Sequence, residues 1–153
     1  MEYMMVTIII TYVIIMSVIS IVFYVLYGIS HMKALKVLGY DRPWMAWIPF
    51  ANNWALAEVV LNGAENINFF NSFEVPALVF KLWWLIAIGV CGVPVVGNLL
   101  SVVIRVICLG TCYIKMFARL DGTDEEKQQV IGYISGFFTI VASCKFLIGR
   151  YGN

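Results

Sequence analysis

The residues best placed to do chemistry lie in the second half of the chain, on a stretch with the apolar composition of a membrane helix. Seven polar or cysteine residues recur there at spacings of 3, 4, 3, 4, 3 and 4, so they fall along one narrow helical face. They are Asn98, Ser101, Arg105, Cys108, Cys112, Lys115 and Arg119. This polar stripe should not face lipid. It predicts either a path for an ion or solute, or a structural face turned toward other helices or another subunit.

Arg105 is the most demanding member of the polar stripe. A charge at mid-bilayer costs roughly 2.5–3.5 kcal/mol on insertion scales, so its guanidinium should meet a partner, water or a lipid phosphate. Glu58 is the acid that can approach it from within another apolar segment, and it is the first candidate partner. Lys81 and Lys145 lie near the ends of their own predicted spans, where they can reach the headgroups.

The residue types give little evidence for a metal site or for catalytic residues. Cys108 and Cys112 share a helical face, but the one histidine, His31, lies far along the chain at an expected membrane interface. We therefore expect four free cysteines, an interfacial histidine, and no metal or cofactor. The chain has no nucleophile elbow, zinc-protease motif, phosphate-binding glycine loop or buried aspartate pair, and we predict that it is not an enzyme.

Composition indicates a membrane protein. Hydrophobic residues make up 62% of the chain and charged residues 12%, against roughly 25% charged in soluble domains. The mean hydropathy is +0.90, and a net charge of +1 without a basic patch argues against nucleic acid binding. The 25 residues from Tyr3 to Tyr27 carry no charge, which is longer than a signal peptide's apolar region. We read them as a retained spanning helix.

The predicted architecture is a single all-α integral membrane domain over residues 1–153. Four transmembrane helices are expected near residues 3–28, 76–92, 97–115 and 128–148, with one re-entrant or interfacial helical hairpin at residues 44–61. The alternative is five transmembrane helices. The four-span arrangement keeps most Lys and Arg on one side of the membrane, which favours it and predicts an external N-terminus.

Two proline breaks and one pair of glycines refine this prediction. Pro49 and Pro94 should each interrupt a helix, with Asn52 and Asn98 close to the next helix start and able to cap it. These breaks are either structural turns or parts of a binding site. In the last span, Gly132 and Gly136 lie four residues apart and predict close helix packing, with the same chain or with another.

Four segments resemble an uncharacterised family of small bacterial multi-pass membrane proteins with tryptophan-flanked Ile-Pro-x-x-Asn segments. They are residues 44–52 (WMAWIPFAN), 93–98 (VPVVGN), 114–119 (IKMFAR) and 146–151 (FLIGRY). The chain departs from that pattern by an extra residue before Asn98, an acidic loop at 121–126 and a longer polar stretch at 62–74. The resemblance implies a bacterial cytoplasmic (inner) membrane and no particular activity.

The predicted function is a non-enzymatic integral membrane subunit or scaffold. Its partners would be the lipid bilayer together with another membrane protein or further copies of the chain. The alternative is a small channel or transporter that uses the polar stripe around Arg105 and the proline-broken helices.

Overall fold

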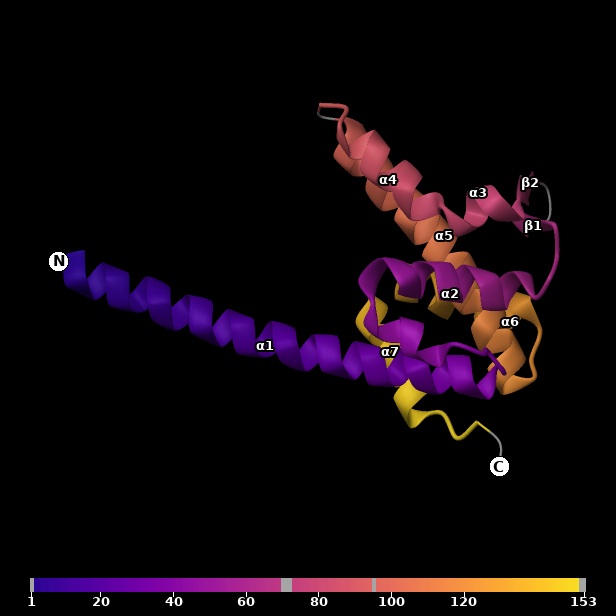
Figure 1. The fold of residues 1–153 in the computed structure, drawn as a ribbon, viewed down its shortest axis with the longest axis horizontal. Helices are drawn as coiled ribbons and strands as arrows, with labels where there is room; N and C mark the ends of the chain where they lie inside the picture. The colour runs from indigo at the N-terminus through magenta and orange to yellow at the C-terminus, as the bar shows by residue number, and fades with distance from the viewer. Residues whose placement is uncertain (1, 70–72, 95, 152–153) are drawn as a thin grey trace.

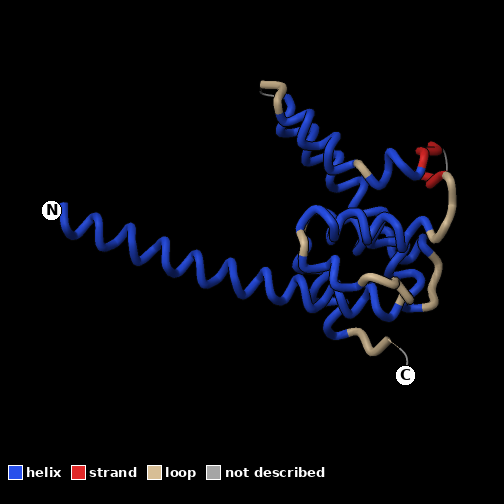
Figure 2. The backbone as a smooth tube through the Cα atoms, viewed as in Figure 1, coloured by secondary structure: helices blue, strands red, loops and turns tan. Residues whose placement is uncertain are grey.

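The computed structural model describes residues 2–69, 73–94 and 96–151, and this part of the chain is mostly helical (Figure 1, Figure 2). The elements in chain order are α1 (Glu2–Val37), the 3-10 helix η1 (Pro43–Trp47), α2 (Pro49–Leu61), β1 (Asn66–Phe69), β2 (Phe73–Pro76), α3 (Ala77–Lys81), α4 (Trp83–Cys91), α5 (Val96–Asp121), α6 (Glu125–Phe137) and α7 (Thr139–Ile148). They form a packed body from which most of α1 and the α4–α5 hairpin project (Figure 1).

Two helices have the length and composition needed to cross a membrane. They are α1, over Tyr3–Val37, and α5. Residues 3–26 of α1 are all exposed, and only the last of them reach the body (Figure 1). At ~1.5 Å per residue these 24 residues alone extend ~36 Å, more than the ~30 Å hydrocarbon core. Apolar helices of spanning length are thus present at two of the expected places, while the crossing itself and the total of four spans stay predictions.

Both predicted proline breaks are confirmed. Helix α2 begins at Pro49, and Pro94 lies in the short connection between α4 and α5; position 95 lies outside the described residues. Asn52 and Asn98 lie in the first turns of α2 and α5. The predicted capping by Asn52 is wrong, because Ile48 occupies the N-cap position of α2 and no side chain caps it there. Asn52 is instead buried, and its side-chain amide donates to the Tyr27 hydroxyl of α1.

Residues 44–61 do not form one spanning helix. Backbone between η1 and α2 is extended at Ile48, and α2 has 13 residues, which extend ~20 Å. Most of α2 is buried in the body. It ends at Asn62 in the left-handed conformation (φ 46°), followed by Gly63 (φ 85°), the backbone geometry that commonly terminates helices.

Two predicted spans are not continuous helices. The segment expected at 76–92 is divided into α3 and α4 at Leu82, and the one expected at 128–148 is divided into α6 and α7 at Phe138 (φ −110°, ψ 90°). Tertiary packing explains the second break. Helix α6 runs along α5, whereas α7 turns to α1, where Phe146 is fully buried against His31.

The polar stretch between α2 and α3 forms a short antiparallel hairpin, an element that the all-α prediction does not include. Strands β1 and β2 pair with Ile67 opposite Val75. Ile67 and Phe69 are buried and alternate with exposed asparagines, so one face of β1 packs on the body. Phe69 contacts Phe80 of α3 edge-to-face, which anchors the hairpin to the helix that follows.

Glycines bring α5 and α6 close together, as predicted. A Cβ built at Gly136 would lie 2.7 Å from the carbonyl oxygen of Val106 and 2.8 Å from the backbone nitrogen of Gly110. Gly132 is equally closed in by Ile114. The neighbour of these glycines is therefore α5 of the same chain, and small residues permit the backbone approach.

Candidate functional site

A buried polar cluster joins α1, α2 and α5 at the centre of the body. His31 and Tyr113 are fully buried, and His31 Nε2 lies 3.0 Å from the Tyr113 hydroxyl. The Tyr113 hydroxyl also pairs with that of Tyr27, which in turn accepts a bond from Asn52. The prediction that His31 is interfacial is wrong. Its ring packs between aromatic side chains, including Phe146, because the imidazole finds hydrogen-bond partners inside the body.

The hydrogen bonds of His31 fix the direction of donation. Nδ1 lies 2.9 Å from the Tyr27 carbonyl oxygen, which can only accept, so Nδ1 carries the proton. In a neutral imidazole Nε2 is then an acceptor, and the Tyr113 hydroxyl donates to it. With its two nitrogens bonded in this way, His31 is a structural link between α1 and α5.

Glu58 pairs with residues other than Arg105. Its carboxylate accepts a hydrogen bond from the Tyr40 hydroxyl at 2.7 Å and lies 3.2 Å from Lys81 Nζ. The expected Glu58–Arg105 pair is therefore absent from the described residues. We predicted that Lys81 extends to the lipid headgroups, but its ammonium group bonds Glu58 instead. Lys81 Nζ also lies 5.2 Å from the centre of a Trp54 ring. The side chains of α3 and α2 meet because the β-hairpin returns the chain over α2.

The hydrogen bond from Tyr40 lowers the pKa of the Glu58 carboxyl. Lys81 lowers this pKa further, whereas desolvation raises it, and the net shift is downward. A carboxyl with a lowered folded-state pKa stabilises the fold above its unfolded pKa of ~4.3, and this stabilisation is lost as the pH falls through the folded pKa. Tyr40→Phe should raise the Glu58 pKa toward its ordinary value. We expect a smaller loss of unfolding free energy between about pH 7 and 3 than in the parent protein.

The measurement is chemical unfolding in detergent across that pH range. In a Glu58→Gln background, Tyr40→Phe should leave the pH dependence unchanged, because no carboxyl remains to titrate. Parallel curves for the parent and Tyr40→Phe proteins would contradict the assignment.

The C-terminal half of the polar stripe is engaged in contacts within the chain. Arg119 donates to the carbonyl oxygens of Val59 and Val60 at 2.6 and 2.9 Å, and so caps the end of α2. Lys115 bonds both carboxylate oxygens of Glu125 at 2.9 Å. Cys112 is buried. These side chains hold α5 to α2 and α6.

Lys145 is part of a second structural cluster. Its Nζ lies 2.8 Å from an Asp121 carboxylate oxygen, 2.7 Å from the Gln128 amide oxygen and 4.3 Å from the centre of the Phe117 ring. The prediction that it extends to headgroups is wrong, because α7 folds back over the α5–α6 turn. Lys145 thus ties the end of the chain to that turn.

The N-terminal half of the polar stripe is different. Asn98 is exposed on the projecting part of α5, and Ser101 and Arg105 line a cavity of about 450 Å³ bounded by α1, α2, α4 and α5. No hydrogen bond or ion pair joins Arg105 to another described residue. The stripe is thus divided between structural contacts and one unpaired cation beside a cavity.

Sequence reasoning missed a matching stripe on α1. Ser17, Ser20, Tyr24, Tyr27 and His31 follow one another at spacings of 3, 4, 3 and 4, so they share one helical face. The last three contact the body, with Tyr24 donating to the Trp47 carbonyl oxygen. The 3, 4 spacing that identifies the polar stripe on α5 also occurs here. It is harder to recognise on α1 because two of the five residues are tyrosines, which resemble their apolar neighbours.

The cysteines are all free: Cys112 is buried, Cys108 is partly buried, and Cys91 and Cys144 are exposed. No group of three His, Cys, Asp or Glu side chains that could hold a metal ion occurs in the part of the chain that the structure describes. No known protein family, curated protein or solved structure matches the chain. Its function must therefore be argued from its own geometry.

Proposed function

We propose that this chain is a non-enzymatic integral membrane subunit or scaffold that assembles with a second copy or with another membrane protein. The observation that carries the proposal is the projecting part of α1. It carries no charge and is exposed over residues 3–26, so within the chain it has almost no packing partner. The two apolar helices of spanning length support a membrane setting, which we propose is a bacterial cytoplasmic membrane, with an external N-terminus expected from the charge distribution.

The α1 stripe supports a protein partner in addition to lipid. Ser17 and Ser20 continue, toward the N-terminus, the face on which Tyr24 and Tyr27 meet the body. Both serine hydroxyls bond the carbonyl four residues earlier, so they demand no partner for their polar groups. Small residues on one face allow another helix to approach closely, which is a main source of helix association in lipid. We therefore place the partner helix on this face.

The contacts of the polar stripe on α5 favour an assembly function and argue against a channel. A conducting path would need polar side chains accessible along the helix, but Lys115 and Arg119 are committed to partners and Cys112 is buried. The channel or transporter alternative is left with the segment from Asn98 to Arg105. Flux through vesicles that Arg105→Leu abolishes would favour that alternative.

The test compares two faces of α1. The native cysteines are replaced, and a single cysteine is introduced at Ser17 or at Ile15, two residues away and ~200° around the helix. In lipid vesicles, oxidation should yield a disulfide dimer from the Ser17 position and little from Ile15 if copies assemble. For a different partner, photo-crosslinkers at the same two positions in native membranes should show the same preference. Equal crosslinking from both faces, or none, would contradict the proposal.

A further inference from the structure

The cavity beside Arg105 is lined by unpaired donors. Trp83 and Trp84 both contribute to its wall, and the indole nitrogens of both are buried without an acceptor. Arg105 adds a guanidinium that no described acid neutralises, since Glu58 is bonded to Tyr40 and Lys81. None of the residues that line the cavity is an aspartate or glutamate. A positive charge in the wall with no acid to neutralise it, beside two indole N–H groups that lack an acceptor, fits an anion.

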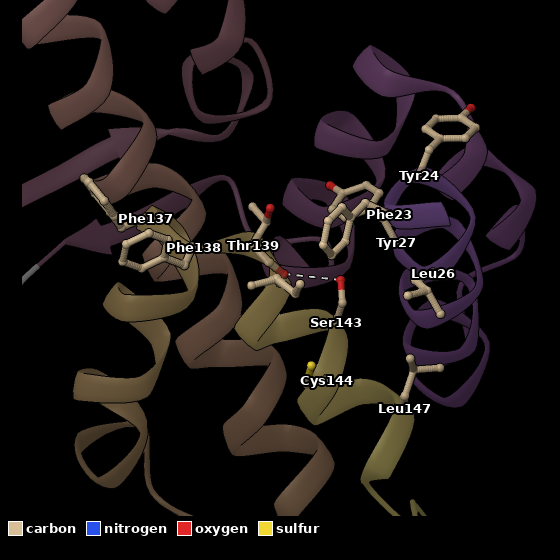
Figure 3. A pocket seen from close by; sticks show the side chains of 11 residues that line it. Phe23, Tyr24, Leu26, Tyr27, Phe137, Phe138, Thr139, Ser143, Cys144 and Leu147 are labelled. Atoms are coloured by element: carbon tan, nitrogen blue, oxygen red, sulfur yellow. Dashed lines mark hydrogen bonds between the residues drawn. The ribbon is translucent and has the colours of Figure 1, made fainter. Parts of the chain in front are cut away.

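A second, apolar cavity adjoins the first. It has a volume of about 520 Å³ and lies between the body end of α1 and α7, with the α6–α7 break at Phe138 on one side (Figure 3). Tyr24, Tyr27 and Thr139 line both cavities. Both volumes fall in the ~300–1,000 Å³ range of ligand sites. The two cavities are therefore neighbours, one beside the cationic Arg105 and the other apolar.

Several polar groups in the wall of the apolar cavity are bonded within the chain. Ser143 of α7 donates to the Thr139 carbonyl oxygen at 3.2 Å (Figure 3), and Tyr24 donates to the Trp47 carbonyl oxygen. Phe23, Leu26 and Leu147 also line this cavity. Such a lining offers an occupant mostly apolar contact, which suits a hydrocarbon chain.

We propose that the two cavities bind one anionic phospholipid, with its phosphate against Arg105 and the Trp84 indole and an acyl chain in the apolar cavity. The negative phosphate offsets the cost of an unpaired cation on an apolar helix and supplies the missing acceptors. Binding would also fix α1 relative to α5, because the site lies between them. This inference goes beyond the proposed assembly and does not require it.

The test uses the full chain in detergent and measures retained lipid by native mass spectrometry. The probes are phosphatidylglycerol and phosphatidylcholine with the same palmitoyl and oleoyl chains. We expect phosphatidylglycerol to bind preferentially, and Arg105→Gln to weaken it about tenfold, as loss of a charged hydrogen bond implies. Lys36→Gln removes an exposed cation at the end of α1 and should leave the preference unchanged.

Two further variants keep the test decisive if Arg105→Gln fails to fold. Trp84→Phe keeps the ring and removes the N–H, and should reduce the preference for phosphatidylglycerol. Cys144→Trp narrows the apolar cavity and should weaken both lipids. Equal binding of the two lipids, a preference that Arg105→Gln or Trp84→Phe leaves intact, or equal loss with Lys36→Gln would overturn the proposal. Displacement of the lipid by millimolar inorganic phosphate would assign the site to a free anion instead.

Discussion

Gly136→Ala should destabilise the protein by about 1–3 kcal/mol, and Gly136→Leu should prevent α6 from packing on α5. The added Cβ would meet backbone atoms of Val106 and Gly110 at 2.7 and 2.8 Å. Backbone of a packed helix cannot rotate away as a flexible side chain can. The two helices must therefore separate along their length, and the contacts of every neighbouring side chain weaken with them.

The matched control is Gly89→Ala, a helical glycine of α4 around which a Cβ would find nothing within 4 Å. Alanine is the better helix former by about 1 kcal/mol, so this variant should be neutral or slightly stabilised. Thermal unfolding of the two variants in the same detergent compares them directly. Equal loss of stability at the two positions would show that close packing at Gly136 is not the cause.

Local signals were sufficient for the features that depend on a few neighbouring residues. The proline breaks, the exposed N-terminal helix and the glycine contact follow from the absent donor of proline, an uncharged run and small-residue spacing. Each of these features depends on residues close together in the sequence, so tertiary packing changes it little.

Pairing between distant residues could not be predicted. Glu58 was expected near Arg105 because both are charges in apolar segments, but an unrecognised β-hairpin brings Lys81 to it. His31 was placed at the interface because a lone histidine between polar residues is typical there. Its burial depends on Tyr113, 82 positions away, which no local pattern indicates.

The break at Phe138 lacks the usual sequence signals. Neither proline nor glycine occurs at the break itself. The aromatic and β-branched residues from Phe137 to Val141 have only a slightly lower helix propensity than alanine, which does not by itself end a helix. The bend is set by where α7 packs. An apolar run of spanning length therefore indicated a membrane helix where the fold makes two shorter ones.

Tyr113→Phe should lower the free energy of unfolding by about 1–3 kcal/mol, although it removes a single oxygen atom. The Tyr113 hydroxyl donates to His31 Nε2, and both residues are fully buried. Without it, the buried imidazole acceptor loses its donor. Tyr12→Phe, at an exposed position on α1, removes the same atom and should have little effect.

A double-mutant cycle distinguishes the hydrogen bond from mere packing. His31→Leu alone removes the acceptor of the Tyr113 hydroxyl and should also be costly, whereas combining it with Tyr113→Phe leaves neither an unpaired donor nor an unpaired acceptor between them. Because replacing both partners by apolar groups is nearly neutral for the bond itself, the double variant should lose clearly less stability than the sum of the two single losses. Strict additivity, measured by chemical unfolding in detergent, would mean that α1 and α5 are joined here by ring contacts alone.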